Sequence, residues 1–64
     1  HKMKILLWEK RNEKDYSTRE LSEKSGISIA AINKIENGKA SPTIRTLEDL
    51  AVALGCSVFD LVEE

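Results

Sequence analysis

The sequence has little of what small proteins use to strengthen a thin hydrophobic core. Cys56 is the only cysteine in 64 residues, so no internal disulfide can form, and zinc sites built from several cysteines are excluded. No apolar run reaches the roughly 20 residues that a membrane-spanning helix needs. These absences favour a single small domain in the reducing cytoplasm, with no membrane contact.

The sequence also lacks the usual groupings of catalytic and ligand-binding residues. It has no glycine-rich phosphate loop and no cluster of metal ligands, and no pair of carboxylates stands out as a catalytic acid and base. A reactive thiol at Cys56 would need a base nearby, and the only histidine is His1, so Cys56 is interpreted as a small packing residue. We therefore expect no enzymatic activity, no cofactor or metal and no small-molecule ligand.

Charge is distributed unevenly along the chain. The net charge is −1, but residues 1–45 hold all ten lysines and arginines against six acids, a local balance of +4. Residues 46–64 hold five acids and no base. A mildly basic body with an acidic tail permits contact with nucleic acid, and it is equally compatible with ordinary solvated helix faces.

Glycine and proline are scarce, and their positions divide the chain into helices. Gly26, Gly38 and Gly55 each follow a helix-like segment, at the place where a left-handed residue closes a helix. The pattern predicts an all-α domain of five helices with short connections. We expect this single domain to occupy residues 3–64, because Met3 looks like a native start and residues 1–2 then lie outside it.

Caps and apolar spacing place the five expected helices. The first spans about residues 3–14, the second starts at Ser17 with the capping box Ser17-Thr18-Arg19-Glu20, and the third has Ser28 as its N-cap. Thr43 is expected to cap the fourth helix and Ser57 a short fifth. The apolar residues expected to face the core are Met3, Leu6, Leu7, Leu21, Ile27, Ile32, Ile35, Leu47, Leu50, Ala51 and Leu54, and the short fifth helix carries Val58, Leu61 and Val62.

Residues 17–42 form the most informative stretch. Two short helix patterns meet at Gly26, and the second is closed by Asn37-Gly38. Such a pair can hold one helix across a DNA backbone and place the next in the major groove.

The spacing of several motifs resembles one known family. These motifs are Glu20-Leu21-Ser22, Gly26-Ile27-Ser28, Ile32, Ile35-Glu36-Asn37-Gly38-Lys39, Pro42 and Leu50-Ala51-Val52-Ala53-Leu54-Gly55. Together they resemble the DNA-binding domain of phage repressors and Cro proteins, the XRE-type helix-turn-helix family, over about Leu7 to Leu61. The resemblance implies a lambda-repressor-like fold with a central helix-turn-helix.

The resemblance also implies which residues contact DNA. The recognition helix is about Ser28–Asn37, and the candidates for base contact are Ser28, Ile29, Ala30, Asn33 and Lys34. The candidates for contact with the DNA backbone are Thr18, Arg19, Asn37, Lys39 and Arg45. Better-known members favour polar side chains where this chain has Ile29 and Ala30. An isoleucine can contact a thymine methyl but cannot hydrogen-bond a purine, and it suits a protein contact equally well.

Two further pairs are expected. The resemblance pairs an arginine at the end of the first helix with the glutamate of Glu-Asn-Gly, which makes Arg11 and Glu36 a partly buried structural ion pair. Phe59 and Val62 are candidates for a homodimer contact, because exposed aromatic side chains favour interfaces. The alternative is that Phe59 folds back onto Trp8 or the fourth helix.

The sequence therefore predicts a sequence-specific DNA-binding transcriptional regulator, a repressor from a bacterium or its phage. We expect a homodimer that binds double-stranded DNA at a near-palindromic operator, with half-sites about one helical turn apart. One alternative is the antitoxin of a toxin–antitoxin pair, with the toxin as protein partner. Another is a helix-turn-helix scaffold that binds a protein such as a co-regulator and not DNA.

Overall fold

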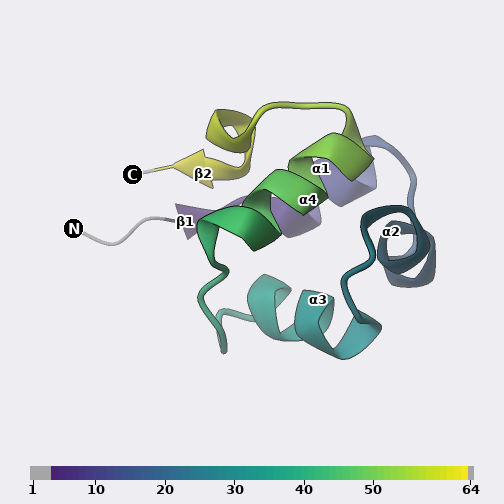
Figure 1. Ribbon diagram of the computed structural model, residues 1–64, viewed down its shortest axis with the longest axis horizontal. Coiled ribbons are helices and arrows are strands. Elements are labelled where there is room, and N and C mark those ends of the chain that lie inside the picture. The colour runs from purple at the N-terminus through teal and green to yellow at the C-terminus, as the bar shows by residue number, and fades with distance from the viewer. Residues whose placement is uncertain (1–3, 64) are drawn as a thin grey trace.

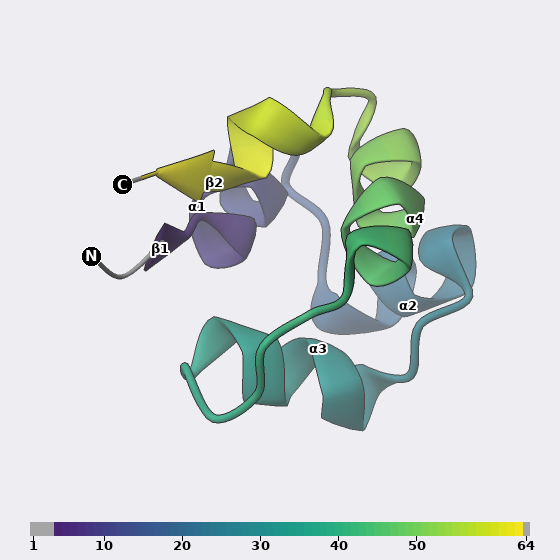
Figure 2. The ribbon, with the colours of Figure 1, turned by 60° about the vertical axis from the view of Figure 1, so that its left-hand side comes forward.

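Helices form most of the computed structural model, which describes residues 4–63 (Figure 1). In chain order the elements are β1 (Lys4–Ile5), α1 (Leu7–Glu13), α2 (Thr18–Ser25), α3 (Ile29–Glu36), α4 (Ile44–Leu54), the 3-10 helix η1 (Val58–Leu61) and β2 (Val62–Glu63). In both Figure 1 and Figure 2, α3 lies along the lower edge of the molecule and η1 lies near the opposite edge. The all-α fold class is confirmed.

The boundaries of α2, α3 and α4 follow from the predicted caps. Ser17 Oγ accepts a hydrogen bond from the Glu20 amide, and the Glu20 carboxylate accepts one from the Ser17 amide, both at 3.0 Å. Thr43 Oγ1 accepts from the Thr46 amide at 3.1 Å and so begins α4. Gly26 (φ 77°) closes α2 in the left-handed conformation. The capping predictions for these helices are confirmed.

The predicted start of the first helix is wrong. Lys4 and Ile5 form β1, which pairs antiparallel with β2, so that Lys4 lies opposite Glu63 and Ile5 opposite Val62. The Leu6 amide then donates to the Leu61 carbonyl at 2.7 Å, and α1 begins only at Leu7. Residues 4–5 adopt extended backbone and not helix because this conformation lets them form the antiparallel pairing with residues 62–63. Met3 and residues 1–2 lie outside the described residues.

The predicted fifth helix is one turn of 3-10 helix, and Val62 lies beyond it in β2. Four residues are too few for an α-helix, and the pairing of β2 with β1 ends the turn. Asp60 Oδ2 accepts hydrogen bonds from the Ser57 amide at 3.0 Å and the Ser57 hydroxyl at 3.2 Å. These bonds lower the pKa of the Asp60 carboxyl, because they favour its charged form.

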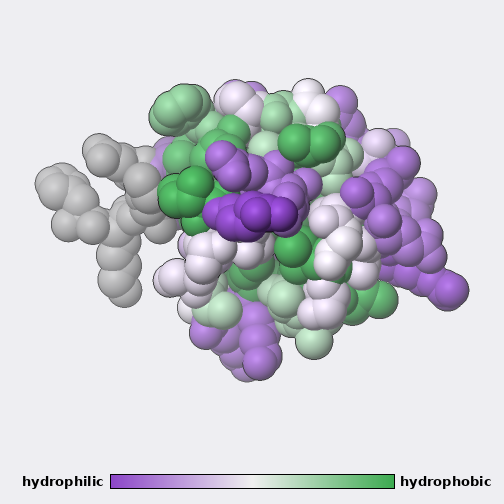
Figure 3. Space-filling model, viewed as in Figure 1, coloured by the Kyte–Doolittle hydropathy of each residue, from purple (hydrophilic) through white to green (hydrophobic). Residues whose placement is uncertain are grey.

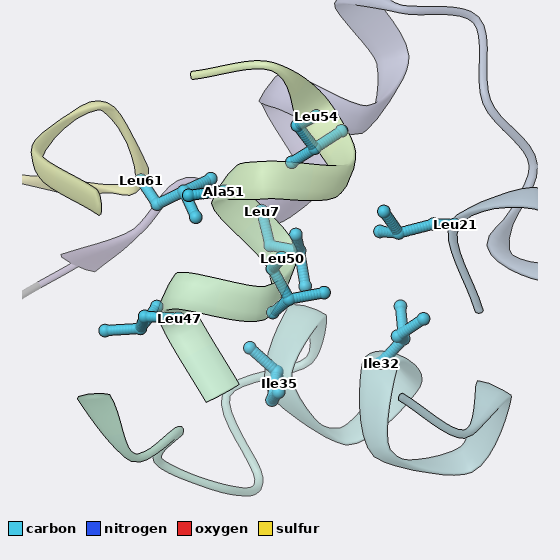
Figure 4. Packing of buried hydrophobic residues seen from close by; sticks show 9 residues of the cluster. All are labelled: Leu7, Leu21, Ile32, Ile35, Leu47, Leu50, Ala51, Leu54 and Leu61. Atoms are coloured by element: carbon cyan, nitrogen blue, oxygen red, sulfur yellow. The ribbon is translucent and has the colours of Figure 1, made fainter. Parts of the chain in front are cut away.

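The core gathers side chains from all the helices (Figure 4). Its buried members are Leu7, Leu21, Ile32, Ile35, Leu47, Leu50, Ala51, Leu54 and Leu61. Figure 4 shows Ile32 and Ile35 projecting from α3 towards the other core side chains, with Ile35 close to Leu50 of α4. Ile27, Val58 and Val62 are partly exposed and pack against this cluster. Leu6 is half-buried. The predicted inward faces of α2, α3 and α4 are confirmed.

Arg11 and Glu36 join α1 to the end of α3. Arg11 Nε donates to Glu36 Oε2 at 2.7 Å, and Arg11 Nη2 donates to Glu36 Oε1 at 3.1 Å. Arg11 Nη1 also donates to the Tyr16 carbonyl at 2.9 Å. The hydrogen bond to Glu36 raises the pKa of Arg11. The two side chains are only 13% and 7% exposed, so this pair is part of the interior and not a surface contact.

We expect Glu36→Ala to destabilise the domain strongly, because it leaves the Arg11 guanidinium buried without its partner. The expected loss is about 3–5 kcal/mol of unfolding free energy, or roughly 15 °C or more in Tm for a domain of this size. Thermal unfolding followed by circular dichroism measures it.

Glu23→Ala is the matched control, because Glu23 belongs to an exposed pair with Arg19 whose side chains are 80% and 69% exposed. That change should cost at most about 1 kcal/mol. Equal effects of the two substitutions would contradict a structural role for Glu36.

Candidate DNA interface

The outer side of α3 is not covered by any other element that the structure describes (Figures 1 and 2). The helix packs on the domain through Ile32 and Ile35, which are 0% and 6% exposed. Its opposite side carries exposed residues in successive turns, first Ile29 and Ala30 and then Asn33 and Lys34. This outer side, with Asn37 in the turn that follows, is named here the α3 outer face.

The predicted base-contact residues therefore share one surface. Ser28, Ile29, Ala30, Asn33 and Lys34 are all exposed, and all except Ser28 lie within α3. Ser28 is the N-cap of α3, since its Oγ accepts a hydrogen bond from the Ala31 amide at 3.2 Å. The cap uses the hydroxyl as an acceptor, and its proton stays free to donate to DNA.

The predicted backbone-contact residues fall into two groups. Asn37 and Lys39 are exposed in the turn after α3, where the Lys39 amide donates to the Lys34 carbonyl at 2.8 Å. Thr18 is half-buried at the first position of α2, where free amides can bind a phosphate oxygen. The candidates thus lie at the start of α2 and in the turn that follows α3, and contacts of this kind would fix a helix in a groove.

Arg19 and Arg45 are exposed but already have acidic neighbours. Arg19 Nε lies 3.6 Å from Glu23 Oε2, and Arg45 Nε lies 3.7 Å from Asp49 Oδ1. Such exposed pairs are weak, so a phosphate can compete for either guanidinium. Arg45 lies on α4, outside the helix-turn-helix itself.

The electrostatics of this region favour an anionic partner. Between Ser28 and Thr43 the sequence holds two lysines, Lys34 and Lys39, and a single carboxylate, that of Glu36. Glu36 is turned inward to Arg11, and within residues 4–63 neither lysine belongs to an ion pair. The surface therefore presents positive charge although the chain as a whole carries −1.

A groove beside α3 adds residues that the sequence interpretation missed. It has a volume of about 500 Å³ and lies between α3 and residues 40–46, with Ala30, Lys34, Ser41 and Thr46 among its lining. Ser41 and Thr46 bring hydroxyl groups next to the candidate base contacts. In the sequence, the only pattern near Ser41 and Thr46 is the predicted N-cap at Thr43, and that pattern predicts where α4 begins and not a contact with DNA.

The proposed dimer residues differ in their surroundings. Phe59 is 85% exposed, so the alternative that it folds back onto Trp8 or α4 is wrong. Val62 is half-buried and packs against the core from β2. Figure 3 shows hydrophobic surface in the region of η1 and β2, at a distance from α3.

Other kinds of site are not found in the described part of the chain. Within residues 4–63, no group of three or more potential metal ligands comes together. No helix in the described part of the chain combines the length and the apolar character that crossing a bilayer requires. Cys56 is half-buried beside the core, and burial raises the pKa of its thiol, as expected for a packing residue.

Residues 9–61 match the helix-turn-helix family, and the chain belongs to this family in its XRE type. This family consists of DNA-binding regulators and not of enzymes. The resemblance found in the sequence is thereby confirmed.

Three relatives are 40% identical to the chain. One is the HTH-type transcriptional regulator y4dJ of Sinorhizobium fredii, aligned over 52 residues, 81% of this chain and 68% of that protein. The others are the HTH-type transcriptional regulators SinR of Bacillus subtilis and of Bacillus licheniformis, each aligned over 55 residues, 84% of this chain and 50% of SinR. The chain thus spans about two thirds of y4dJ and half of SinR.

We expect Gly26→Ala to destabilise the domain by about 1–2 kcal/mol, because Gly26 sits at the hinge between α2 and α3 with a positive φ. A Cβ atom at Gly26 would meet nothing within 4 Å, so the cost is one of backbone conformation and not of a clash. Denaturant unfolding measures the change. Gly26→Asn should cost less, since asparagine tolerates the left-handed region; an equal cost for both variants would contradict this explanation.

Proposed function

We propose that this chain is the DNA-reading domain of a sequence-specific transcriptional repressor. In this proposal α3 enters the major groove, and α2 lies across the DNA backbone. The observation that carries it is the α3 outer face, which is uncovered, contiguous and flanked by lysines without ion-pair partners in residues 4–63. The names of y4dJ and SinR, both transcriptional regulators, support the same role.

The first experiment separates DNA binding from a protein-binding scaffold. Affinity for random duplex DNA is measured as salt is raised, because each phosphate neutralised by a lysine or arginine adds about 0.9 to the negative log–log slope. A steep slope supports the proposal. No association at low salt would contradict it and favour the scaffold, for which the exposed Ile29 is suited.

Lys39→Ala should weaken binding to all duplex sequences by a similar factor and reduce the salt slope by about one, because Lys39 contacts phosphate. Lys14→Ala removes the same charge from the turn after α1, which lies away from α3 in Figures 1 and 2, and it should change neither quantity. Fluorescence anisotropy at several salt concentrations measures both variants. Equal slopes for Lys39→Ala and the wild type would remove the phosphate role.

Asn33→Ala should instead change sequence preference, because an asparagine that bonds an adenine edge discriminates by about 1–3 kcal/mol. Selection of bound sequences from a random duplex pool, for the wild type and this variant, measures the change. A uniform loss of affinity with an unchanged consensus would show that Asn33 contacts the backbone and not a base.

We further propose that two copies bind a near-palindromic operator as a homodimer, with contacts through Phe59 and Val62. The support is the position of Phe59, which is 85% exposed on a 3-10 turn capped by Ser57 and Asp60. A large aromatic side chain held in water in this way gains free energy when a partner covers it.

Phe59→Ala should therefore shift sedimentation equilibrium towards monomer without lowering Tm, because Phe59 contributes little to the core. Ile44→Ala is the control, since Ile44 is 68% exposed at the opposite end of α4 from η1. A wild-type chain that stays monomeric at high concentration, both free and on operator DNA, would end the dimer proposal.

A further inference from the structure

The α3 outer face changes character along its length. Its first turn presents only apolar side chains, Ile29 and Ala30, and its second turn presents the polar pair Asn33 and Lys34. Ile29 is 41% exposed, so much of its side chain faces water in the free protein. Side chains exposed in this way need a partner surface of matching chemistry if they are to be buried in a complex.

The apolar first turn of α3 lies at the N-terminus of the helix, and this position indicates which part of the DNA it would contact. The residues near the N-terminus of a recognition helix are the ones that contact base edges. Ile29 and Ala30 occupy these positions, and the nearest polar side chain is that of the N-cap Ser28, which lies before the first turn and keeps only its hydroxyl proton free for DNA. Hydrogen-bonded readout of bases is therefore unavailable to the side chains of the first turn itself.

The major groove offers one apolar group among its base edges, the methyl group at C5 of thymine. Contact of Ile29 with the edge of a guanine or cytosine would instead bury donors and acceptors without partners, which is costly. Ala30 beside it is small enough to let the helix approach the base pairs closely.

We propose that the first turn of α3 recognises a pyrimidine C5 methyl group, so that each half-site places a thymine against Ile29 and Ala30. This inference rests on the proposed DNA-binding function and names the base chemistry of the same site. Asn33 lies four residues further along α3, or about 6 Å at 1.5 Å per residue. That distance is close to two base-pair steps of about 3.4 Å, so an adenine bonded by Asn33 falls within about two base pairs of the thymine.

The test removes single methyl groups from DNA. The duplex selected by the wild-type chain is made again with deoxyuridine in place of thymidine, one position at a time. At one or two positions in each half-site, affinity should fall about fourfold, the value expected for one buried methyl group. At the same positions, 5-methylcytosine should bind more tightly than cytosine by a similar factor, because both bases share the remaining groups.

Two protein variants connect the effect to Ile29. Ile29→Ala should abolish the difference between thymine and uracil, while Tm stays close to the wild-type value because the side chain is exposed. Val52→Ala, which truncates an 82% exposed aliphatic side chain in the last turn of α4, should preserve the difference.

The outcomes distinguish a failure of the methyl readout from a failure of the proposed DNA-binding function. Specific binding that ignores every uracil substitution, or a thymine preference that survives Ile29→Ala, would overturn the methyl readout and leave the DNA-binding function intact. Absence of binding to any duplex at low salt would overturn both. A fourfold effect confined to the wild type and Val52→Ala supports the inference.

Discussion

The one-sided attachment of α3 is the constraint on which the rest of the structure depends. A helix of eight residues has no stability of its own in water. It persists here because Ile32 and Ile35 bury one side of it in the core, where α3 packs mainly against α2 and also against α1, and because Glu36 is fixed to Arg11 at its end. Every contact that holds α3 is on the inner side or at a terminus, so the outer side is free to change without loss of the fold. Stability thus depends on the inner residues of α3, while the proposed recognition depends on different residues of the same helix.

The Arg11–Glu36 pair also has an electrostatic consequence. A carboxylate in the last turn of a recognition helix would repel phosphate if it faced outward. Its side chain is only 7% exposed, and the guanidinium of Arg11 neutralises it with two hydrogen bonds. The positive charge of the lysines at positions 34 and 39 is then not opposed by an exposed carboxylate from their own segment. This arrangement explains how a chain with a net charge of −1 can present a basic face, while its acids gather in residues 46–64.

Local signals were sufficient to predict the middle of the fold but not its ends. The capping box at Ser17, the caps at Ser28 and Thr43 and the glycine at position 26 each act within a few residues, and the structure has α2, α3 and α4 where these signals place them. The β1–β2 pair joins residues 4–5 to residues 62–63, and no local sequence pattern predicts a contact between residues so far apart in the chain. In the candidate site, helical spacing correctly predicted that Ile32 and Ile35 face the core, and the family resemblance named the residues on the opposite side of α3. The inward turn of Glu36 came from the family resemblance and not from spacing, and the exposure of Phe59 depends on the path of a single 3-10 turn.

The division of the α3 outer face into an apolar and a polar turn bears on how affinity and specificity are separated. Lysine contacts with phosphate supply affinity that is nearly independent of sequence and falls as salt rises. A methyl contact supplies only about 0.8 kcal/mol, but it depends weakly on salt and vanishes when one carbon atom is removed from a base. Because Ile29 and Ala30 can form no hydrogen bond, they cannot bind tightly to a wrong base by rearranging, as a glutamine or arginine can. Discrimination at the first turn is therefore set by the fit of two small apolar surfaces, and the contribution of hydrogen bonds is left to Asn33 and its neighbours one turn away.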